Sequence, residues 1–128
     1  MQNFKSFKVW EREHLFTLRV NEASTTFPND EIYSLTKQLR RAASSIPANI
    51  AESCGKNSQS EFAHLLNVAL GSPNESEYFQ ILSKDLHYLT NEKFIDLSTT
   101  INEIKAMLIS LISKIRSENN LRLITYNL

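Results

Sequence analysis

The sequence is poor in the residues that interrupt helices, and it has almost no cysteine. Its 128 residues include 2 glycines, 3 prolines and 1 cysteine. So few glycines and prolines argue against an all-β or a disordered chain. The single cysteine, Cys54, excludes an internal disulfide and is typical of a reducing compartment.

Long apolar segments are also lacking. No apolar run approaches the roughly 20 residues needed to cross a bilayer. The segment Met1–Lys5 does not lead into the apolar core of a signal peptide. We therefore expect one soluble, cytoplasmic domain.

An excess of charge of one sign is absent as well. Lysine plus arginine and aspartate plus glutamate both number 14, so the formal net charge is zero. A strongly basic chain would have indicated nucleic-acid binding by charge alone. Here such binding would have to come from a local patch or from assembly.

What the chain does contain is apolar residues at helical spacing. They predict four helices, over about residues 6–23, 30–54, 58–89 and 91–117. The candidate N-caps are Ser6 for the first helix, Asn29 or Asp30 for the second, Ser58 or Ser60 for the third, and Thr90 or Asn91 for the fourth. The last helix has the clearest stripe, which steps regularly by three and four residues: Phe94, Leu97, Ile101, Ile104, Leu108, Leu111 and Ile115. Residues 1–117 are predicted to form the domain. Residues 118–128 form an apolar tail that either frays or docks on the bundle or a neighbouring subunit.

The second predicted helix carries its apolar stripe on Ile32, Leu35, Leu39, Ala42 and Ile46, and Pro47 follows directly. Proline removes a backbone donor and costs about 3 kcal/mol inside a helix. The helix therefore either ends at residue 46 or kinks and continues, and the helix-forming residues that follow favour the kink. Gly55 would then supply a left-handed C-terminal cap.

The third predicted helix contains Gly71 and Pro73, which leaves a break or a bent continuous helix as alternatives. We expect Gly71 to permit a close approach of the second helix. The expected inner residues are apolar throughout: Phe62, Leu65, Leu66 and Ala69 in the first half, and Phe79, Leu82, Leu86 and Leu89 in the second.

Two segments carry a family resemblance, QLRRAASSIPANIAES (38–53) and SEFAHLLNVALGSPNESEY (60–78). In this order they resemble the four-helix bundle proteins encoded in intervening sequences of bacterial 23S ribosomal RNA genes, often labelled S23 ribosomal proteins. They are also similar to accessory variability determinant proteins of diversity-generating retroelements. The resemblance covers about residues 7–115 and implies an all-α, antiparallel up-down four-helix bundle, commonly assembled as a ring-shaped pentamer. Pro73 stands where the family has a bulky apolar residue.

Four polar residues form a candidate cluster. Asn49 lies on the inner stripe of the second helix, where an unpaired amide would cost about 1–3 kcal/mol. Its expected partners lie opposite, around Ser72 and Glu75, and we interpret the cluster as fixing the register of two helices. Asn49, Glu52 and Glu75 also match motif positions of the family.

A candidate nucleic-acid-binding patch consists of Lys37, Arg40 and Arg41, which Lys8 and Arg12 could join. The alternative is a solvated or intersubunit ion-pairing face. The retroelement relatives are thought to bind nucleic acid and a reverse transcriptase, so the resemblance implies a phosphate-binding role. The zero net charge of this chain weakens that implication.

The first predicted helix carries two apolar stripes, which is more than one buried face requires. The first comprises Phe7, Trp10 and Leu18, and the second comprises Val9, Phe16 and Val20. Either both stripes face the core, or part of this surface contacts another subunit. Trp10 and Phe16 are the candidate interface residues.

Catalytic and metal-binding patterns are weak. Glu61 and His64 have the Glu-x-x-His spacing of di-iron bundles, but such a site needs a second copy of the motif. His14, His87 and Cys54 are scattered at no ligand spacing. We expect no metal, no cofactor and no catalytic residue.

The leading functional hypothesis is a non-enzymatic assembly module that acts as an adaptor for RNA or for an RNA-bound partner. The alternatives are a scaffold that binds only proteins and, least favoured, a metal-dependent enzyme in the bundle core.

Overall fold

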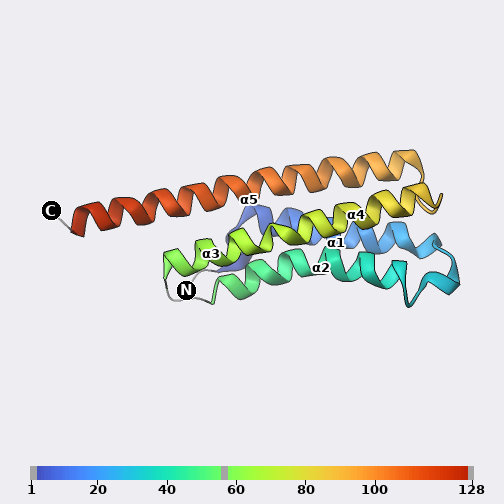
Figure 1. Cartoon of the computed structure of the whole chain (residues 1–128), viewed down its shortest axis with the longest axis horizontal. Coiled ribbons are helices and arrows are strands. Elements are labelled where there is room, and N and C mark those ends of the chain that lie inside the picture. Colours follow the sequence, from blue (N-terminus) through green and yellow to red (C-terminus); the bar gives the residue numbers. More distant parts are fainter. Residues whose placement is uncertain (1–2, 56–57, 127–128) are drawn as a thin grey trace.

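The computed structural model describes residues 3–55 and 58–126, with side chains through residue 118. Figure 1 shows its helices lying lengthwise beside one another. The elements are η1 (Phe4–Ser6), α1 (Lys8–Ala23), η2 (Ser24–Thr26), η3 (Asn29–Glu31), α2 (Leu35–Ser53), α3 (Gln59–Ala69), α4 (Gly71–Asp85) and α5 (Asn91–Tyr126). The described residues contain no strand, and the predicted all-α four-helix bundle is confirmed.

Helices α3 and α4 follow one another and together form one of the four rods (Figure 1). Helix α1 packs against α2 and α5, and α4 also packs against α2 and α5. Helices α1 and α4 therefore lie on a diagonal of the bundle. None of the described helices is both long enough and apolar enough to cross a membrane.

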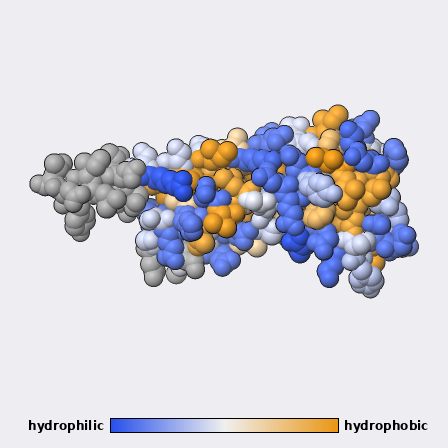
Figure 2. Space-filling model, in the orientation of Figure 1, coloured by the Kyte–Doolittle hydropathy of each residue, from blue (hydrophilic) through white to orange (hydrophobic). Residues whose placement is uncertain are grey.

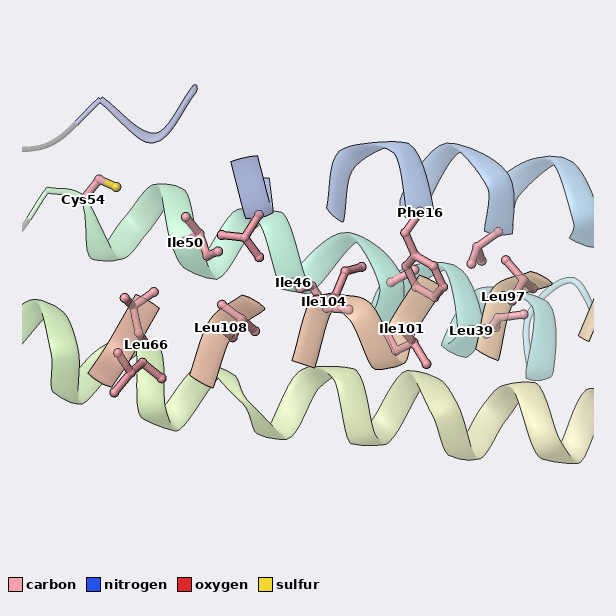
Figure 3. Packing of buried hydrophobic residues seen from close by; sticks show 14 of the residues in the cluster. Phe16, Leu39, Ile46, Ile50, Cys54, Leu66, Leu97, Ile101, Ile104 and Leu108 are labelled. Atoms are coloured by element: carbon pink, nitrogen blue, oxygen red, sulfur yellow. The ribbon is translucent and has the colours of Figure 1, made fainter. Parts of the chain in front are cut away.

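The core lies between the rods, as the side chains in Figure 3 show. Most of the stripe predicted for the last helix is buried: Leu97 is 2% exposed, and Ile101, Ile104 and Leu108 are fully buried. Phe94 and Leu111 are half-buried. Burial of one such side chain stabilises a fold by about 1.5–3 kcal/mol. From α2 the core receives an equally regular set, namely Leu39, Ala42, Ala43, Ile46 and Ile50.

Helix α2 continues through Pro47, as predicted. Pro47 has no N–H, so the carbonyl of Ala43 loses its helical donor. The hydroxyl of Thr17 on α1 lies 3.2 Å from that carbonyl oxygen and 3.0 Å from Glu13 O of its own helix, and its one proton is shared between the two acceptors. A neighbouring helix thus brings a donor to the backbone group that the proline leaves free.

Several predicted helix ends need correction. Helix α2 begins at Leu35 because the short helix η3 occupies residues 29–31, and Ile32 is 50% exposed. The left-handed cap at Gly55 is wrong: no described glycine has a positive φ, and the helix ends through Cys54 in right-handed geometry. Helix α1 begins at Lys8, after η1, so Ser6 does not cap it.

Two predicted N-caps are confirmed. The Ser58 hydroxyl accepts from the backbone N–H of Glu61 at 3.1 Å, at the start of α3. The Thr90 hydroxyl accepts from the backbone N–H of Lys93 at 3.2 Å, at the start of α5. Each cap satisfies a donor that the first turn of a helix leaves unpaired.

The third rod is interrupted only at Leu70, whose backbone is still right-handed helical (φ −59°, ψ −20°). Pro73 is the third residue of α4, where a proline is tolerated because the first turn has no helical acceptors for its N–H groups. The predicted close approach at Gly71 is wrong, because a Cβ there would meet no atom within 4 Å.

The inner face predicted for the second half of this rod is wrong in part: Leu89 is buried in the core and Phe79 packs partly against it, but neither Leu82 nor Leu86 is buried. The buried residues of α4 are Pro73, Ser76, Gln80 and Ser83. By contrast Leu86 is 44% exposed. Helix α4 thus turns a mainly polar side inward.

Helix α4 ends at Asp85, before the predicted end near Leu89. The backbone N–H of Tyr88 donates to Ser83 O at 2.9 Å, and that of His87 donates to Lys84 O at 2.9 Å. This pattern is a Schellman cap, which requires a left-handed residue just past the helix. His87 takes that place with φ 64°.

Helix α5 does not end near residue 117 but continues to Tyr126. Figure 1 shows its C-terminal part extending past the ends of the other helices. The proposed boundary between a domain at 1–117 and a tail at 118–128 stays a prediction.

Candidate functional site

The predicted polar cluster is brought together between α2 and α4. The Asn49 side-chain amide donates to the Ser72 hydroxyl at 3.0 Å, so the half-buried amide has the partner that its position requires. Glu75 pairs with Arg41 of α2. That the cluster fixes the register of the two helices stays a prediction.

An open pocket of about 280 Å³ lies over this cluster. Its lining combines the carboxylates of Glu52 and Glu75 with other polar side chains and with small or apolar ones. The lining residues are Asn49, Glu52, Ser53, Leu65, Val68, Ala69, Gly71, Ser72 and Glu75. The pocket offers hydrogen-bonding groups and apolar contact, but its lining residues include no histidine that could activate the hydroxyl of Ser53 or Ser72.

The five predicted nucleic-acid-binding residues do not form one patch. Arg12 faces α5, where its Nη1 lies 3.5 Å from Glu103 Oε2. Arg41 faces α4 and pairs with Glu75. The two guanidinium groups therefore lie on different sides of the bundle, and each is beside a carboxylate.

The other three basic residues are also divided. Arg40 donates from Nε to the Ser24 hydroxyl at 2.8 Å, which places it at the C-terminal end of α1. Lys37 is exposed on α2 near the same end. Lys8 is exposed at the first residue of α1, at the opposite end of that helix. Lys37 lies one helical turn from both Arg40 and Arg41 on α2, whereas Lys8 and Arg12 lie apart from these three.

The two predicted interface residues differ in burial. Phe16 is fully buried within the single chain, so it cannot contact another subunit and that prediction is wrong. The stripe it belongs to, with Val9 and Val20, faces the core of its own bundle. Trp10 is half-buried and stacks on His14 with ring centroids 5.3 Å apart. Trp10 as an interface residue stays a prediction.

The cysteine and histidines do not assemble into a site. Cys54 is 2% exposed, and burial raises the pKa of its thiol, which makes the thiolate less available. His64 is exposed on α3, and His14 is exposed on α1. Among the described residues, no group of three or more histidine, cysteine, aspartate or glutamate side chains is placed to hold a metal ion.

Sequence reasoning missed two buried polar residues, Glu13 and Gln80, which are both fully buried. Neither oxygen of Glu13 has a hydrogen-bond partner among the described residues, and the same holds for Gln80 Oε1. Burial raises the pKa of Glu13 to about 8. A signal was present: Glu13 lies four residues after Val9 and three before Phe16, within the buried stripe of α1.

Comparison with known proteins gives a consistent family assignment. The family described as 23S rRNA-intervening sequence protein matches residues 5–110. No curated protein matches. A solved structure from Bacteroides thetaiotaomicron VPI-5482, described as a protein of unknown function from the S23 ribosomal protein family, is 31% identical and superposes with a TM-score of 0.74. The likeness covers 82% of this chain and 95% of that chain. This chain belongs to the family of 23S rRNA-intervening sequence proteins.

Proposed function

We propose that this protein is a non-enzymatic, cytoplasmic scaffold that works by self-association into a ring. The observation that carries the proposal is a pair of exposed apolar faces on the diagonal helices α1 and α4. Large exposed apolar patches on a soluble protein typically mark interaction sites.

The α4 face consists of Tyr78, Ile81 and Leu86, which are 57%, 41% and 44% exposed. It exists because α4 turns polar residues such as Gln80 toward the core and leaves apolar residues outside. Figure 2 shows apolar side chains gathered where α4 ends and α5 begins, separated by a hydrophilic band from a second apolar area nearer the middle.

The α1 face consists of Trp10, Leu15 and Leu18. Leu15 is 39% exposed and Leu18 is 54% exposed, while Trp10 is half-buried. Trp10 also packs partly against the core, whereas Leu15 and Leu18 lie on the exposed side of α1. Aromatic residues such as Trp10 often dominate the energetics of an interface.

The two faces point away from each other because outward sides of diagonal helices lie on opposite sides of a bundle. If the α1 face of one copy binds the α4 face of the next, the contact is head-to-tail. Such contacts produce rings when the rotation between copies closes. A pentamer is the ring size that the family resemblance favours.

The test is light scattering combined with size-exclusion chromatography on two variants, Leu18→Lys and Ile81→Lys. We expect each variant to be monomeric where the unaltered chain forms a ring, because a lysine replaces apolar contact. An equimolar mixture should form dimers only, since each variant keeps one intact face. Ile109→Lys is the matched control: Ile109 is 58% exposed on α5 and belongs to neither face.

An unaltered chain that is monomeric at all concentrations would reject the proposal. A mixture that stays monomeric would reject the head-to-tail arrangement. Circular dichroism would confirm that each variant remains helical.

The absence of an enzymatic role is part of the same proposal. The family description names no activity, and the related Bacteroides thetaiotaomicron protein is described as having unknown function. The residues that line the pocket beside Asn49 and Ser72 include two serines but no histidine, cysteine or lysine.

A second candidate function is an adaptor for RNA, which is supported by Lys37 and Arg40. They are neighbours on α2, and neither belongs to an ion pair among the described residues. In a ring this basic pair would be repeated in every subunit, and the positive field would add. Contacts of this kind weaken steeply with salt because counterions are released from the phosphates.

Filter binding of a 23S ribosomal RNA fragment over a range of salt concentrations would test this function. Arg40→Ala should reduce both the affinity and its salt dependence. Arg12→Ala should change neither, because Glu103 already neutralises Arg12. If the RNA does not bind at low salt, the adaptor function is rejected and the scaffold that binds only proteins remains.

A further inference from the structure

The open pocket beside Asn49 and Ser72 lies where α2 passes the junction of α3 and α4. Helix α2 packs against both of these helices (Figure 1). The pocket has a volume of about 280 Å³. Pockets that bind drug-sized ligands have volumes of about 300–1,000 Å³, so this one is suited to a smaller ligand or to a single side chain.

Short side chains keep the pocket open. Three of the residues that line it at the junction are Ala69, Gly71 and Ser72. A Cβ added to Gly71 would meet no atom within 4 Å, so no other part of the chain fills the space beside this residue. The backbone does not require a glycine there, because no described glycine has a positive φ. Gly71 therefore leaves a space that a larger side chain could occupy without backbone strain.

The charged side chains of the lining are both acidic, Glu52 and Glu75. Glu75 Oε1 accepts a hydrogen bond from Arg41, which is not a lining residue, while Glu52 belongs to no ion pair among the described residues. The start of a helix attracts anions, but α4 continues from α3 through the helical backbone of Leu70. The pocket thus has an excess of negative charge and favours a cation.

The polar groups of the pocket are mainly hydrogen-bond acceptors. The Asn49 amide nitrogen donates to the Ser72 hydroxyl at 3.0 Å, which leaves the Asn49 side-chain oxygen as an acceptor. Glu75 Oε2 and the two oxygens of Glu52 are acceptors as well. The Ser53 hydroxyl donates its proton to the Asn49 backbone oxygen at 2.7 Å. A ligand with several N–H donors would complement these groups.

Two kinds of cation fit this lining poorly. Among the described residues, no group of three or more histidine, cysteine, aspartate or glutamate side chains could hold a metal ion. Quaternary ammonium ions are recognised by aromatic rings, and the lining residues include none. Leu65 and Val68 instead offer aliphatic contact, and Val68 is 62% exposed.

We propose that this pocket binds a primary ammonium group on a short aliphatic chain, as carried by a lysine side chain or by a small free amine. The ammonium group donates its three N–H groups to Glu52, Glu75 and Asn49. The aliphatic chain lies along Leu65 and Val68. This binding depends neither on self-association nor on RNA.

The first experiment uses the unaltered chain and three probes with the same butyl group: n-butylammonium, n-butyltrimethylammonium and n-butanol. Nuclear magnetic resonance follows the methyl groups of Leu65 and Val68 during each titration. We expect saturable binding of n-butylammonium that weakens with salt, and binding of the other two that is weaker by about fivefold or more, because they lack its charged N–H donors. Equal binding of all three probes, or no saturable binding of n-butylammonium, would overturn the proposal.

The second experiment places the site by substitution. Gly71→Leu should abolish the binding of n-butylammonium, because its side chain fills the pocket. Glu52→Gln should weaken binding by about fivefold, because it removes a charged acceptor. Glu61→Gln is the matched control, since Glu61 is an exposed acid of α3 outside the lining, and its variant should bind as the unaltered chain does. Undiminished binding by a helical Gly71→Leu variant would overturn the proposal.

Two further probes distinguish the sources of the ammonium group. If the natural ligand is a lysine side chain, N-acetyl-lysine methylamide should bind as tightly as n-butylammonium, because its backbone can remain outside the open pocket. If the natural ligand is a free amine, cadaverine should bind at least as tightly as n-butylammonium, and the lysine derivative should bind more weakly. Failure of both to bind would overturn the proposal.

Discussion

Helices α5 and α4 show the two ways in which a bundle helix can relate to its sequence. In α5 most of the apolar residues at heptad spacing are buried, namely Leu97, Ile101, Ile104, Leu108 and Ile115, while Leu111 is half-buried. In α4 the buried residues are largely polar, and Tyr78, Ile81 and Leu86 are exposed. The same spacing rule holds in both helices, but only in α5 does it coincide with the apolar residues.

The buried positions of the third rod show why. They run Phe62, Leu66, Ala69, Pro73, Ser76, Gln80 and Ser83, in steps of four and three residues. The inward-facing positions therefore keep the same helical spacing across the interruption at Leu70. The prediction instead moved the inward face to Phe79, Leu82 and Leu86, because those are the apolar residues. Helix geometry sets which positions face the core, and composition does not move them.

The largest expected effect comes from removing a buried apolar side chain of α5. Ile104→Ala should lower the free energy of unfolding by about 2–5 kcal/mol, because it leaves a cavity at a fully buried position. Ile81→Ala in α4 should cost about 0.5 kcal/mol within one subunit, since Ile81 is 41% exposed. Urea denaturation under conditions where both variants have the same oligomeric state would measure this. Equal losses would mean that α4 buries its apolar side after all.

A smaller effect tests the inner face of α4. Ser76→Leu makes the seam more apolar, yet it should destabilise the fold by about 1–3 kcal/mol, because a fully buried serine leaves no room for a larger side chain. Asn74→Leu is the control on the exposed side of the same helix and should change stability by about 0.5 kcal/mol or less. A Ser76→Leu variant that is more stable than the unaltered chain would show that the inner side of α4 has room for a larger apolar residue, and that only its polar residues limit the stability there.

The smallest effect concerns the end of α4, which the sequence placed too late. His87→Gly should raise the free energy of unfolding by about 1 kcal/mol, because glycine tolerates the left-handed backbone that His87 adopts at φ 64°. His87→Ala keeps a Cβ and should bring no such gain. Thermal unfolding of the two variants would compare them, and a gain in both would point to the imidazole rather than to the backbone.

Much of the candidate site could be anticipated locally. The bond from Asn49 to Ser72 was expected because a polar residue on an inner stripe needs a partner on the facing helix. The division of the basic residues could not be anticipated, because it depends on which neighbouring helix Arg12 and Arg41 each face. Phe16 was misassigned for the same reason, since two apolar stripes on one helix look alike until its neighbours are placed.

The sequence by itself determined the order of the four rods, the caps at Ser58 and Thr90, and the passage of α2 through Pro47, because these depend on residues a few positions apart. Only the tertiary structure decided which side of α4 faces inward, which donor reaches the carbonyl freed by Pro47, and that a carboxyl group lies unpaired at the centre. Those features depend on groups far apart in the chain, whose meeting is set by how the rods pack against each other.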